Sequence, residues 1–277
     1  MLSALGAGDL SAARLVEGHL DALAIAAELG TPDLVSEHHL AGVWAAQPTG
    51  VRARRGASTW TLCGQKDWCS GAGIIECALV TASAADGPRL FAVNAGHIDV
   101  LRETWEPRGM LASASATVAF DGSRSIQPLG GPNAYVDRAG FGHGGVGVAA
   151  VWFGATVTAL LGCRPVADAV SERARWGGAR AAVEAAGARL AQAADEIDAH
   201  PCDRARAVSL AHSVRLTVSD VARSVVRLAT EISGTSGLCR DSAYHQSLID
   251  LDVYLTQIRA GAVGVEHANA IGELRCW

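Results

Sequence analysis

The sequence has few charged residues, few aromatic residues and no long basic segment. Charged residues make up 18% of its 277 residues and aromatic residues 5%, whereas hydrophobic residues make up 49%, which indicates a globular chain. The formal net charge is -5, and Lys and Arg form no stripe that would contact phosphates, so we expect no nucleic-acid partner. The densest basic run, RARR at 52–55, is interpreted as a solvated loop, with a phosphate or CoA contact as the alternative.

Paired cysteines and targeting signals are also missing. The seven cysteines show neither CxxC nor metal-ligand spacing, so we expect no metal site and no disulfide framework, but reduced thiols in a cytoplasmic protein. Residues 1–15 lack a basic segment followed by an apolar run, so we expect no signal peptide. Residues 139–163 carry no Asp, Glu, Lys or Arg, yet the glycines within 140–147 are expected to break their first half. We interpret the second half as a buried bundle helix and expect no membrane span.

Apolar spacing predicts a helix followed by strands. Residues 10–30 place four leucines near one face and stop at Gly30, which is typical of an amphipathic helix. From about residue 43 to residue 135, short apolar runs alternate with Gly, Pro, Asp and Ser. This texture predicts the strands of an antiparallel sandwich or barrel.

The rest of the chain predicts long helices joined by short connectors. Apolar residues recur at three- and four-residue spacing over 179–200 and 203–234, and further helices are expected over 242–259 and, less regularly, 263–273. Such helices pack as antiparallel neighbours in a bundle. The predicted fold is therefore α+β, with a residual N-terminal helical segment (1–42), a middle antiparallel β domain (43–137) and a C-terminal four-helix bundle (138–277).

One stretch, GQKDWCSGAG at 64–73, places a tryptophan beside a serine and then only small residues. Ordinary strand packing with a core indole also explains it. Four further segments follow the same order as motifs of a known family: VWAAQP (43–48), WEPRGMLASAS (105–115), EISGTSG (231–237) and LIDLDVYLTQIRAG (248–261). With this ordered set, the chain resembles the acyl-CoA dehydrogenase family of flavoproteins over nearly its whole length.

The resemblance implies FAD as the cofactor and an acyl thioester or a related small molecule as the substrate. Trp68 would pack on the flavin and the Ser70 hydroxyl would bond near its reactive nitrogen, while the small residues 71–73 would let the backbone approach the ring. Ala46 occupies the position of a hydroxyl residue that contacts the flavin pyrimidine in the family. Gly234 and Gly237 belong to a second cofactor-binding turn.

The family's catalytic carboxylate is absent from the matching positions, Arg259, Ala260 and Gly261. Removal of an α proton needs a base, and His143 can accept a proton near neutral pH. Glu266 and His267 are further candidates. Ordinary helix positions are the alternative interpretation of all three residues.

Further departures from the family concern the cofactor and the substrate pocket. Glu231 places a carboxylate where a pyrophosphate needs hydrogen-bond donors, and no counterpart of the family's E-R-x-x-F-G segment is found near 168–180. The first helices of the family's N-terminal domain have no counterpart either. The chain is thus expected to be a shortened member, to have a pocket open to a larger ligand, or to receive that wall from a partner chain.

Three functions follow from these matches and departures. The first is a flavin-dependent oxidoreductase, in which α-proton removal accompanies transfer of a hydride to the flavin. The second is a biosynthetic enzyme that uses the same scaffold for cyclisation or isomerisation without redox chemistry. The third is a non-catalytic subunit that pairs with a complete dehydrogenase. Apolar faces on the bundle helices also predict a homo-oligomer, a dimer or a tetramer.

Overall fold

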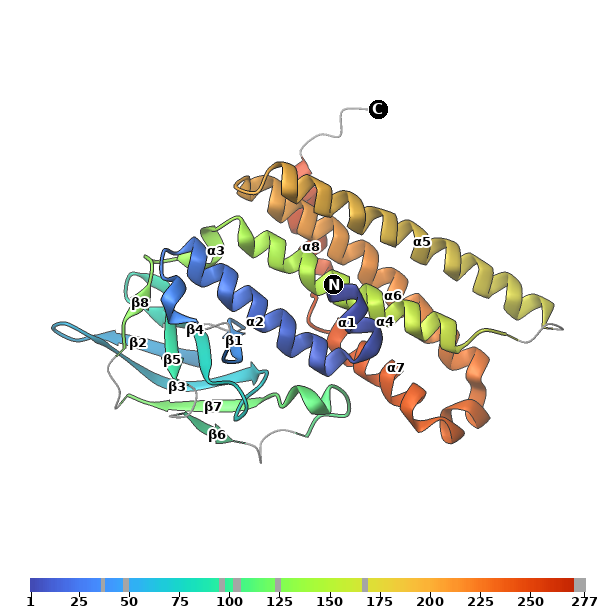
Figure 1. The fold of residues 1–277 in the computed structure, drawn as a ribbon, viewed down its shortest axis with the longest axis horizontal. Helices are drawn as coiled ribbons and strands as arrows, with labels where there is room; N and C mark the ends of the chain where they lie inside the picture. The colour runs from blue at the N-terminus through green and yellow to red at the C-terminus, as the bar shows by residue number, and fades with distance from the viewer. Residues whose placement is uncertain are drawn as a thin grey trace. The chain divides into compact units, whose positions relative to one another are not determined.

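The computed structural model describes residues 1–35, 38–46, 50–94, 98–101, 106–122, 126–165 and 169–271 (Figure 1). The chain forms two compact units, which we treat separately. The helical unit contains Met1–Ala13, Arg108–Met110 and Gly142–Trp277, and the sheet unit contains Arg14–Pro107 and Leu111–Phe141. The three-part division expected from the sequence stays a prediction, because these units group residues by contact and not by chain order.

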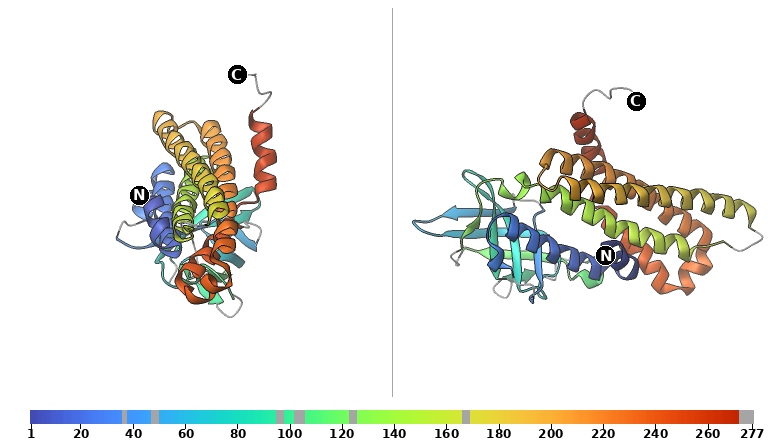
Figure 2. Two further views of the ribbon diagram at one scale, coloured as in Figure 1. Left: turned by 90° about the vertical axis from the view of Figure 1, so that its right-hand side faces the viewer. Right: turned by 45° about the horizontal axis from the view of Figure 1, so that its top comes forward.

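The helical unit is a bundle of long helices around one apolar core. Figures 1 and 2 show α4, α5 and α6 side by side. Trp152 of α4, Val214 of α6 and Leu251 of α7 are among its fully buried side chains. Its elements are α1 (Leu2–Gly8), the start of α2 (Leu10–Glu28), α4 (Gly140–Gly162), α5 (Val170–Ala199), α6 (Arg204–Arg240), α7 (Ser242–Leu255) and α8 (Ala260–Ile271).

Helix α4 corrects the expectation that glycines break the first half of residues 139–163. The helix is continuous over Gly140–Gly162. Glycine is needed at two positions because other backbone lies against the helix: a Cβ on Gly142 would collide with Ala207, and one on Gly154 would collide with Ser3. Among the described residues, α4 alone is long and apolar enough to cross a membrane, and 56% of its most apolar window is buried inside the structure. That burial fits a core helix, as the sequence predicts for its second half.

The ends of the later helices differ slightly from those predicted. Helix α6 continues to Arg240, but Gly234 has non-helical dihedral angles (φ 55°, ψ -174°), so the predicted turn is a break within the element. Helix α7 ends at Leu255 and not at residue 259, and α8 begins at Ala260 and not at residue 263. Asp241 closes the junction between α6 and α7, since its carboxylate accepts a hydrogen bond from the Tyr244 amide (2.9 Å).

The sheet unit has a single sheet with the strand order β6-β7-β3-β2-β4-β5-β8, and β1 pairs with β4. Helix α2 packs against one face, where Ile25 lies in a buried cluster with Leu79 and Leu90. The elements are η1 (Pro32–Leu34), β1 (Ala41–Trp44), β2 (Val51–Arg55), β3 (Trp60–Cys69), β4 (Cys77–Ala84), β5 (Gly87–Asn94), β6 (Asp99–Leu101), η5 (Leu111–Ser113), β7 (Ala116–Asp121), β8 (Pro128–Leu129) and α3 (Ala134–Asp137).

Strand β1 departs from the expected antiparallel pattern, because it pairs with β4 in parallel. A parallel pair needs a long connection, which β2 and β3 provide between β1 and β4. The described pairing of β1 with β4 ends at Trp44–Val80, and β2 meets the same strand at Arg52–Ser83. Strands β1 and β2 therefore follow one another along one side of β4.

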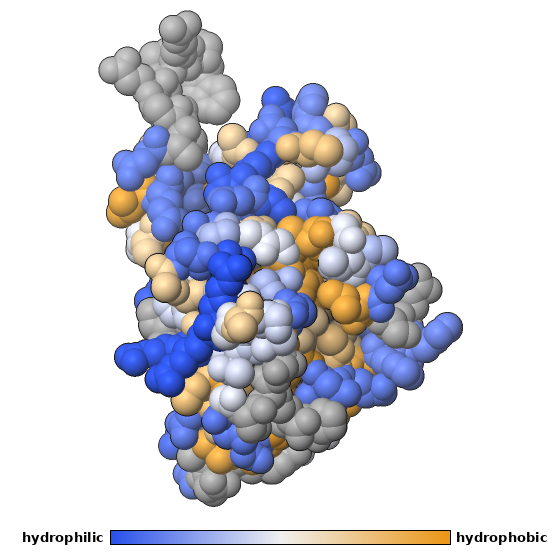
Figure 3. Space-filling view, turned by 90° about the vertical axis from the view of Figure 1, so that its left-hand side faces the viewer, coloured by the Kyte–Doolittle hydropathy of each residue, from blue (hydrophilic) through white to orange (hydrophobic). Residues whose placement is uncertain are grey.

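The basic run RARR is part of strand β2 and not a loop, which corrects that expectation. Ala53 points inward, whereas Arg52, Arg54 and Arg55 are exposed. The guanidinium of Arg55 lies 5.9 Å from the ring centre of Trp60. Figure 3 views the left-hand side of Figure 1, where strongly hydrophilic residues lie among hydrophobic ones. Arg52 and Arg54 are thus the outer positions of an alternating strand, and Arg55 is its exposed last residue.

Candidate functional site

Trp68 is an exposed aromatic residue at an irregular point of β3. The register between β3 and β7 shifts between Lys66 and Cys69, which marks a β-bulge. Trp68 has φ 63°, a left-handed conformation that is unfavourable for a bulky residue, and its side chain is 53% exposed. The bulge turns the indole outward and leaves Lys66 and Cys69 inside. A strained backbone that presents a large aromatic side chain to solvent marks a functional candidate.

Ser70 belongs to a cluster of three serine hydroxyls, and the other two, Ser113 and Ser115, have no role predicted from the sequence. The Ser115 hydroxyl donates to the Ser70 hydroxyl (3.1 Å), and the Ser113 and Ser115 hydroxyls lie 2.9 Å apart. The Ser113 carbonyl accepts a hydrogen bond from the Gly71 amide (2.8 Å). Both added serines lie in the quoted segment 105–115, whereas Trp105 of that segment lies outside the described residues. Residues 64–73 and 105–115 thus meet at one place, which the motif order alone did not specify.

The end of β1 is attached to the same place. The Trp44 indole donates to the Ser70 carbonyl (2.9 Å), and Trp44 itself is buried. Ala46, two residues later, is exposed, and residues 47 and 48 of the quoted motif lie outside the described residues. The structure therefore attaches the last residue of β1, two residues before Ala46, to Ser70.

Lys66 lies beneath this strand end. Its side chain is 1% exposed, and its ammonium group donates to the Thr81 carbonyl (2.9 Å) and to the Thr81 hydroxyl (3.2 Å). The Thr81 hydroxyl in turn donates to the Ala45 carbonyl (3.2 Å). Burial lowers the pKa of the Lys66 ammonium group to about 8. Burial also raises the pKa of the neighbouring Cys69 thiol to about 12, so this thiol is protonated at neutral pH.

The small residues after Ser70 are explained by packing. Gly71 and Ala72 are buried, and a Cβ on Gly71 would lie 2.5 Å from Ile75 and 3.2 Å from Leu15. Gly71 also has a positive φ of 76°, which glycine adopts without strain. These two residues are small because the turn folds back on itself. Gly73 is exposed, and the expectation that residues 71–73 let the backbone approach a flavin ring stays a prediction.

The proton-transfer candidates His143 and Glu266 lie in the helical unit. His143 is half-buried in the first turn of α4. Glu266 is 65% exposed and lies 3.4 Å from the imidazole of His212, a residue that the sequence analysis did not consider. Burial lowers the pKa of His212, and the ring of His267 meets it edge-on with centroids 6.4 Å apart. The structure thus groups Glu266 with two histidines at the contact of α6 and α8.

The second predicted cofactor turn contains a break and an ion pair. Gly234 interrupts α6, and a Cβ there would meet no other atom within 4 Å, whereas Gly237 lies in the following helical turn. Glu231 forms an exposed ion pair with Arg175 of α5. That guanidinium partly neutralises the carboxylate that would oppose a pyrophosphate.

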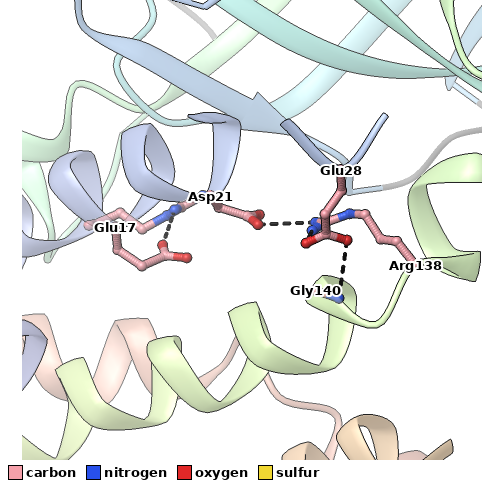
Figure 4. Close-up of polar contacts among 6 residues, drawn as sticks. Glu17, Asp21, Glu28, Arg138 and Gly140 are labelled. Carbon is pink, nitrogen blue, oxygen red and sulfur yellow. Dashed lines mark hydrogen bonds and ion pairs between the residues drawn. The ribbon is translucent and has the colours of Figure 1, made fainter. Parts of the chain in front are cut away.

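Carboxylates also lie on α2, but arginines hold them (Figure 4). Arg138 donates to Asp21 (3.0 Å) and to Glu28 (3.5 Å), and Glu28 also accepts a hydrogen bond from the Gly140 amide (3.3 Å). Burial raises the pKa of Asp21, and Arg138 opposes that change. A carboxylate fixed on a buried guanidinium is a poor proton acceptor, so this network is structural.

An apolar groove lies between α4 and α5 of the helical unit. Phe153, Val157 and Leu161 line one side, and Trp176 and Val183 line the other. Leu161 is 62% exposed. Opposite charges, Arg180 and Glu184, border it.

No protein-family model matches the chain, and no curated protein sequence matches it. Solved structures do. TdsC from Paenibacillus sp. A11-2, a dibenzothiophene monooxygenase, in complex with FMN and indole has a TM-score of 0.82 at 16% identity, over 99% of this chain and 82% of that chain. Glutaryl-CoA dehydrogenase from Mycobacterium smegmatis in complex with FADH2 has a TM-score of 0.82 at 16% identity, over 100% and 79%. A steroid ACAD has a TM-score of 0.74 at 20% identity, over 96% of this chain and 81% of that chain. The chain therefore has the acyl-CoA dehydrogenase fold, as the sequence resemblance predicts.

Proposed function

We propose that this chain is a flavin-dependent oxidoreductase that acts on an acyl thioester or a related small molecule. One observation carries the proposal: the bulge in β3 exposes Trp68 in a strained conformation, two residues before Ser70, whose hydroxyl joins two others. An isoalloxazine ring needs a flat apolar surface and nearby hydroxyl groups, and these residues supply both. Solved proteins with this fold are complexed with FMN or FADH2, which supports a flavin here.

The chain's own residues would bind and orient the cofactor. The Trp68 indole would cover one face of the ring, and the Ser70 hydroxyl, held by Ser115, would donate to a ring heteroatom. The Trp44 bond to the Ser70 carbonyl fixes the backbone that carries this hydroxyl. A bound flavin supplies the redox chemistry by accepting a hydride from the substrate. For the proton that leaves the substrate, we retain His143 and Glu266 as candidate acceptors.

FAD is the cofactor we propose, and its two halves have unequal support. The ring contacts of Trp68 and Ser70 serve FMN and FAD equally. Binding of the adenylate half depends on the turn at 231–237. There Glu231 replaces a neutral hydrogen-bond donor, and Arg175 only partly neutralises its negative charge. We therefore expect FMN and FAD to bind with affinities within about tenfold of each other, which is about 1.4 kcal/mol.

A non-redox function on the same scaffold is the second candidate. The positions that match the family's base hold Arg259, Ala260 and Gly261, which offer no carboxylate to remove an α proton. An enzyme that has lost this base can still use the cleft for cyclisation or isomerisation. Failure to bind either flavin would favour this candidate.

The deciding experiment is flavin binding by protein purified without added cofactor, followed by visible absorbance and by titration with FAD and FMN. Trp68→Ala together with Ser70→Ala should weaken binding at least tenfold, because the aromatic stacking contact and the Ser70 hydrogen bond each contribute about 1 kcal/mol. Ile74→Ala is the matched control, since Ile74 is 49% exposed in the same turn. Equal affinity of the double variant and the control would remove Trp68 and Ser70 from the site.

We also propose a cytoplasmic homo-oligomer in which a second copy covers the groove between α4 and α5. Its lining is apolar, and its border carries Arg180 and Glu184. Arg180 and Glu184 pair with each other across one helical turn (2.8 Å), so this border adds no net charge that would repel a second copy in a two-fold contact.

A further inference from the structure

We propose that Lys66 is a positioning residue for the candidate flavin site, which holds the end of β1 at Ala45 and Ala46 through Thr81. This inference rests on the proposed function, because it assigns the Lys66 ammonium group a role in shaping the flavin-binding surface. The proposal combines the composition of the chain, the burial of the side chain and an interruption in the sheet.

The composition singles out Lys66. It is the only lysine in the chain, beside 22 arginines. Elsewhere the chain meets every requirement for a fixed positive side chain with arginine, yet here a lysine is buried. An ammonium group is compact and its three donors can point at the carbonyl and the hydroxyl of one residue, whereas a guanidinium is larger and donates in a flat fork. The contact with Thr81 needs the compact group.

A buried lysine costs more free energy than an apolar side chain that fills the same space. Moving an ammonium group out of water costs free energy unless hydrogen bonds offset it, and methionine would fill the same volume without that cost. Burial also lowers the pKa of the group. A lysine at this position is therefore expected to do something that an apolar side chain does not.

The strand pairing shows why Thr81 can accept hydrogen bonds from Lys66. The described β1–β4 pairing ends at Trp44–Val80, and β2 meets β4 only at Arg52–Ser83, so Thr81 lies where the two strands are interrupted. Lys66 reaches this interruption from β3 and donates to Thr81.

The contact continues to the strand end. The Thr81 hydroxyl, which accepts from Lys66, donates to the Ala45 carbonyl. On its other side, the same strand end is held by the bond from Trp44 to Ser70. Two contacts thus fix the backbone next to the Ser70 hydroxyl: the bond from Trp44 to Ser70, and the chain of bonds from Lys66 through Thr81 to Ala45. Loosening the second contact should loosen the surface that would meet the flavin.

The test uses Lys66→Met, which keeps the length but removes the donors, and Thr81→Val, which removes only the hydroxyl. Thr156→Val is the matched control: Thr156 is 1% exposed and its hydroxyl donates to the Trp152 carbonyl (2.7 Å) in the helical unit. Hydrogen exchange of residues 41–46 is measured without cofactor, and FAD and FMN dissociation constants are measured by fluorescence. Circular dichroism shows that each variant is folded.

We expect at least fivefold faster exchange of residues 41–46 and at least tenfold weaker flavin binding in both Lys66→Met and Thr81→Val, with the control unchanged. The double variant should be no worse than Lys66→Met, because both act through one path. Wild-type exchange in Lys66→Met, or faster exchange with unaltered flavin affinity, would overturn the proposal. If the wild type binds neither flavin, the proposed function fails, and the exchange measurement alone still decides whether Lys66 holds the strand end.

Discussion

The titration of Lys66 predicts a measurable change of stability with pH. Burial lowers its pKa from 10.5 to about 8, and at about 1.4 kcal/mol for each pKa unit the charged form is disfavoured by about 3.5 kcal/mol in the folded chain. Between these two pKa values the unfolded chain binds the proton and the folded chain does not, so the free energy of unfolding rises with pH across this window. Below about pH 8 the full cost of burying the charge is present, and above pH 10.5 it is gone.

The assay compares urea unfolding of the wild type and Lys66→Met at pH 7 and pH 10. From pH 7 to pH 10, the free energy of unfolding of the wild type should rise by about 2 to 3 kcal/mol relative to that of Lys66→Met. Cys69 and other groups titrate in both proteins, so their contributions to the pH dependence of the free energy of unfolding largely cancel in the difference. Because the chain has one lysine, carbon-13 lysine labelling gives a single side-chain signal that reports the pKa directly. Parallel stability changes in the two proteins, or a midpoint near 10.5, would refute the reasoning.

Three further substitutions test other parts of the structure. Trp68→Gly should leave the free energy of unfolding within about 1 kcal/mol of wild type, because glycine relieves the left-handed strain, while flavin binding falls about fivefold; a large loss of stability would make Trp68 a structural residue. Arg138→Met should cost about 3–5 kcal/mol in urea unfolding by leaving Asp21 buried without its guanidinium, and adding Asp21→Leu should recover part of this; no loss would contradict the burial argument. Leu161→Asp should lower the mass of the assembly measured by light scattering, and an unchanged mass would exclude the groove as the interface.

Local patterns predicted most of the helices and strands, because each pattern reports burial along one element. The amphipathic spacing of 10–30 corresponds to α2, and the alternating runs after residue 43 correspond to strands of the sheet. The same reasoning was wrong for α4. Glycine lowers helix propensity, but close contact with the backbone at Ala207 and Ser3 requires it, and tertiary packing overrides the local preference.

The polar parts of the candidate site could be predicted only in fragments. Ser70 was found because a tryptophan and small residues surround it in the sequence. Ser115 lay within a quoted motif but had no assigned role, because its bond to Ser70 joins residues 45 positions apart. Hydrogen bonds between distant segments leave no periodicity in either one.

Lys66 shows why the sequence is least informative about such positioning residues. A lysine between a glutamine and an aspartate reads as a solvated strand position, and its neighbours Gln65 and Asp67 are indeed exposed. Strand alternation alone allows Lys66 to point inward, but only an acceptor there makes that position tolerable for a charge. The acceptor is Thr81, which lies on β4 between the last described pair with β1 and the pair with β2. The burial of one lysine therefore depends on the path of three strands, which no window of sequence around it contains.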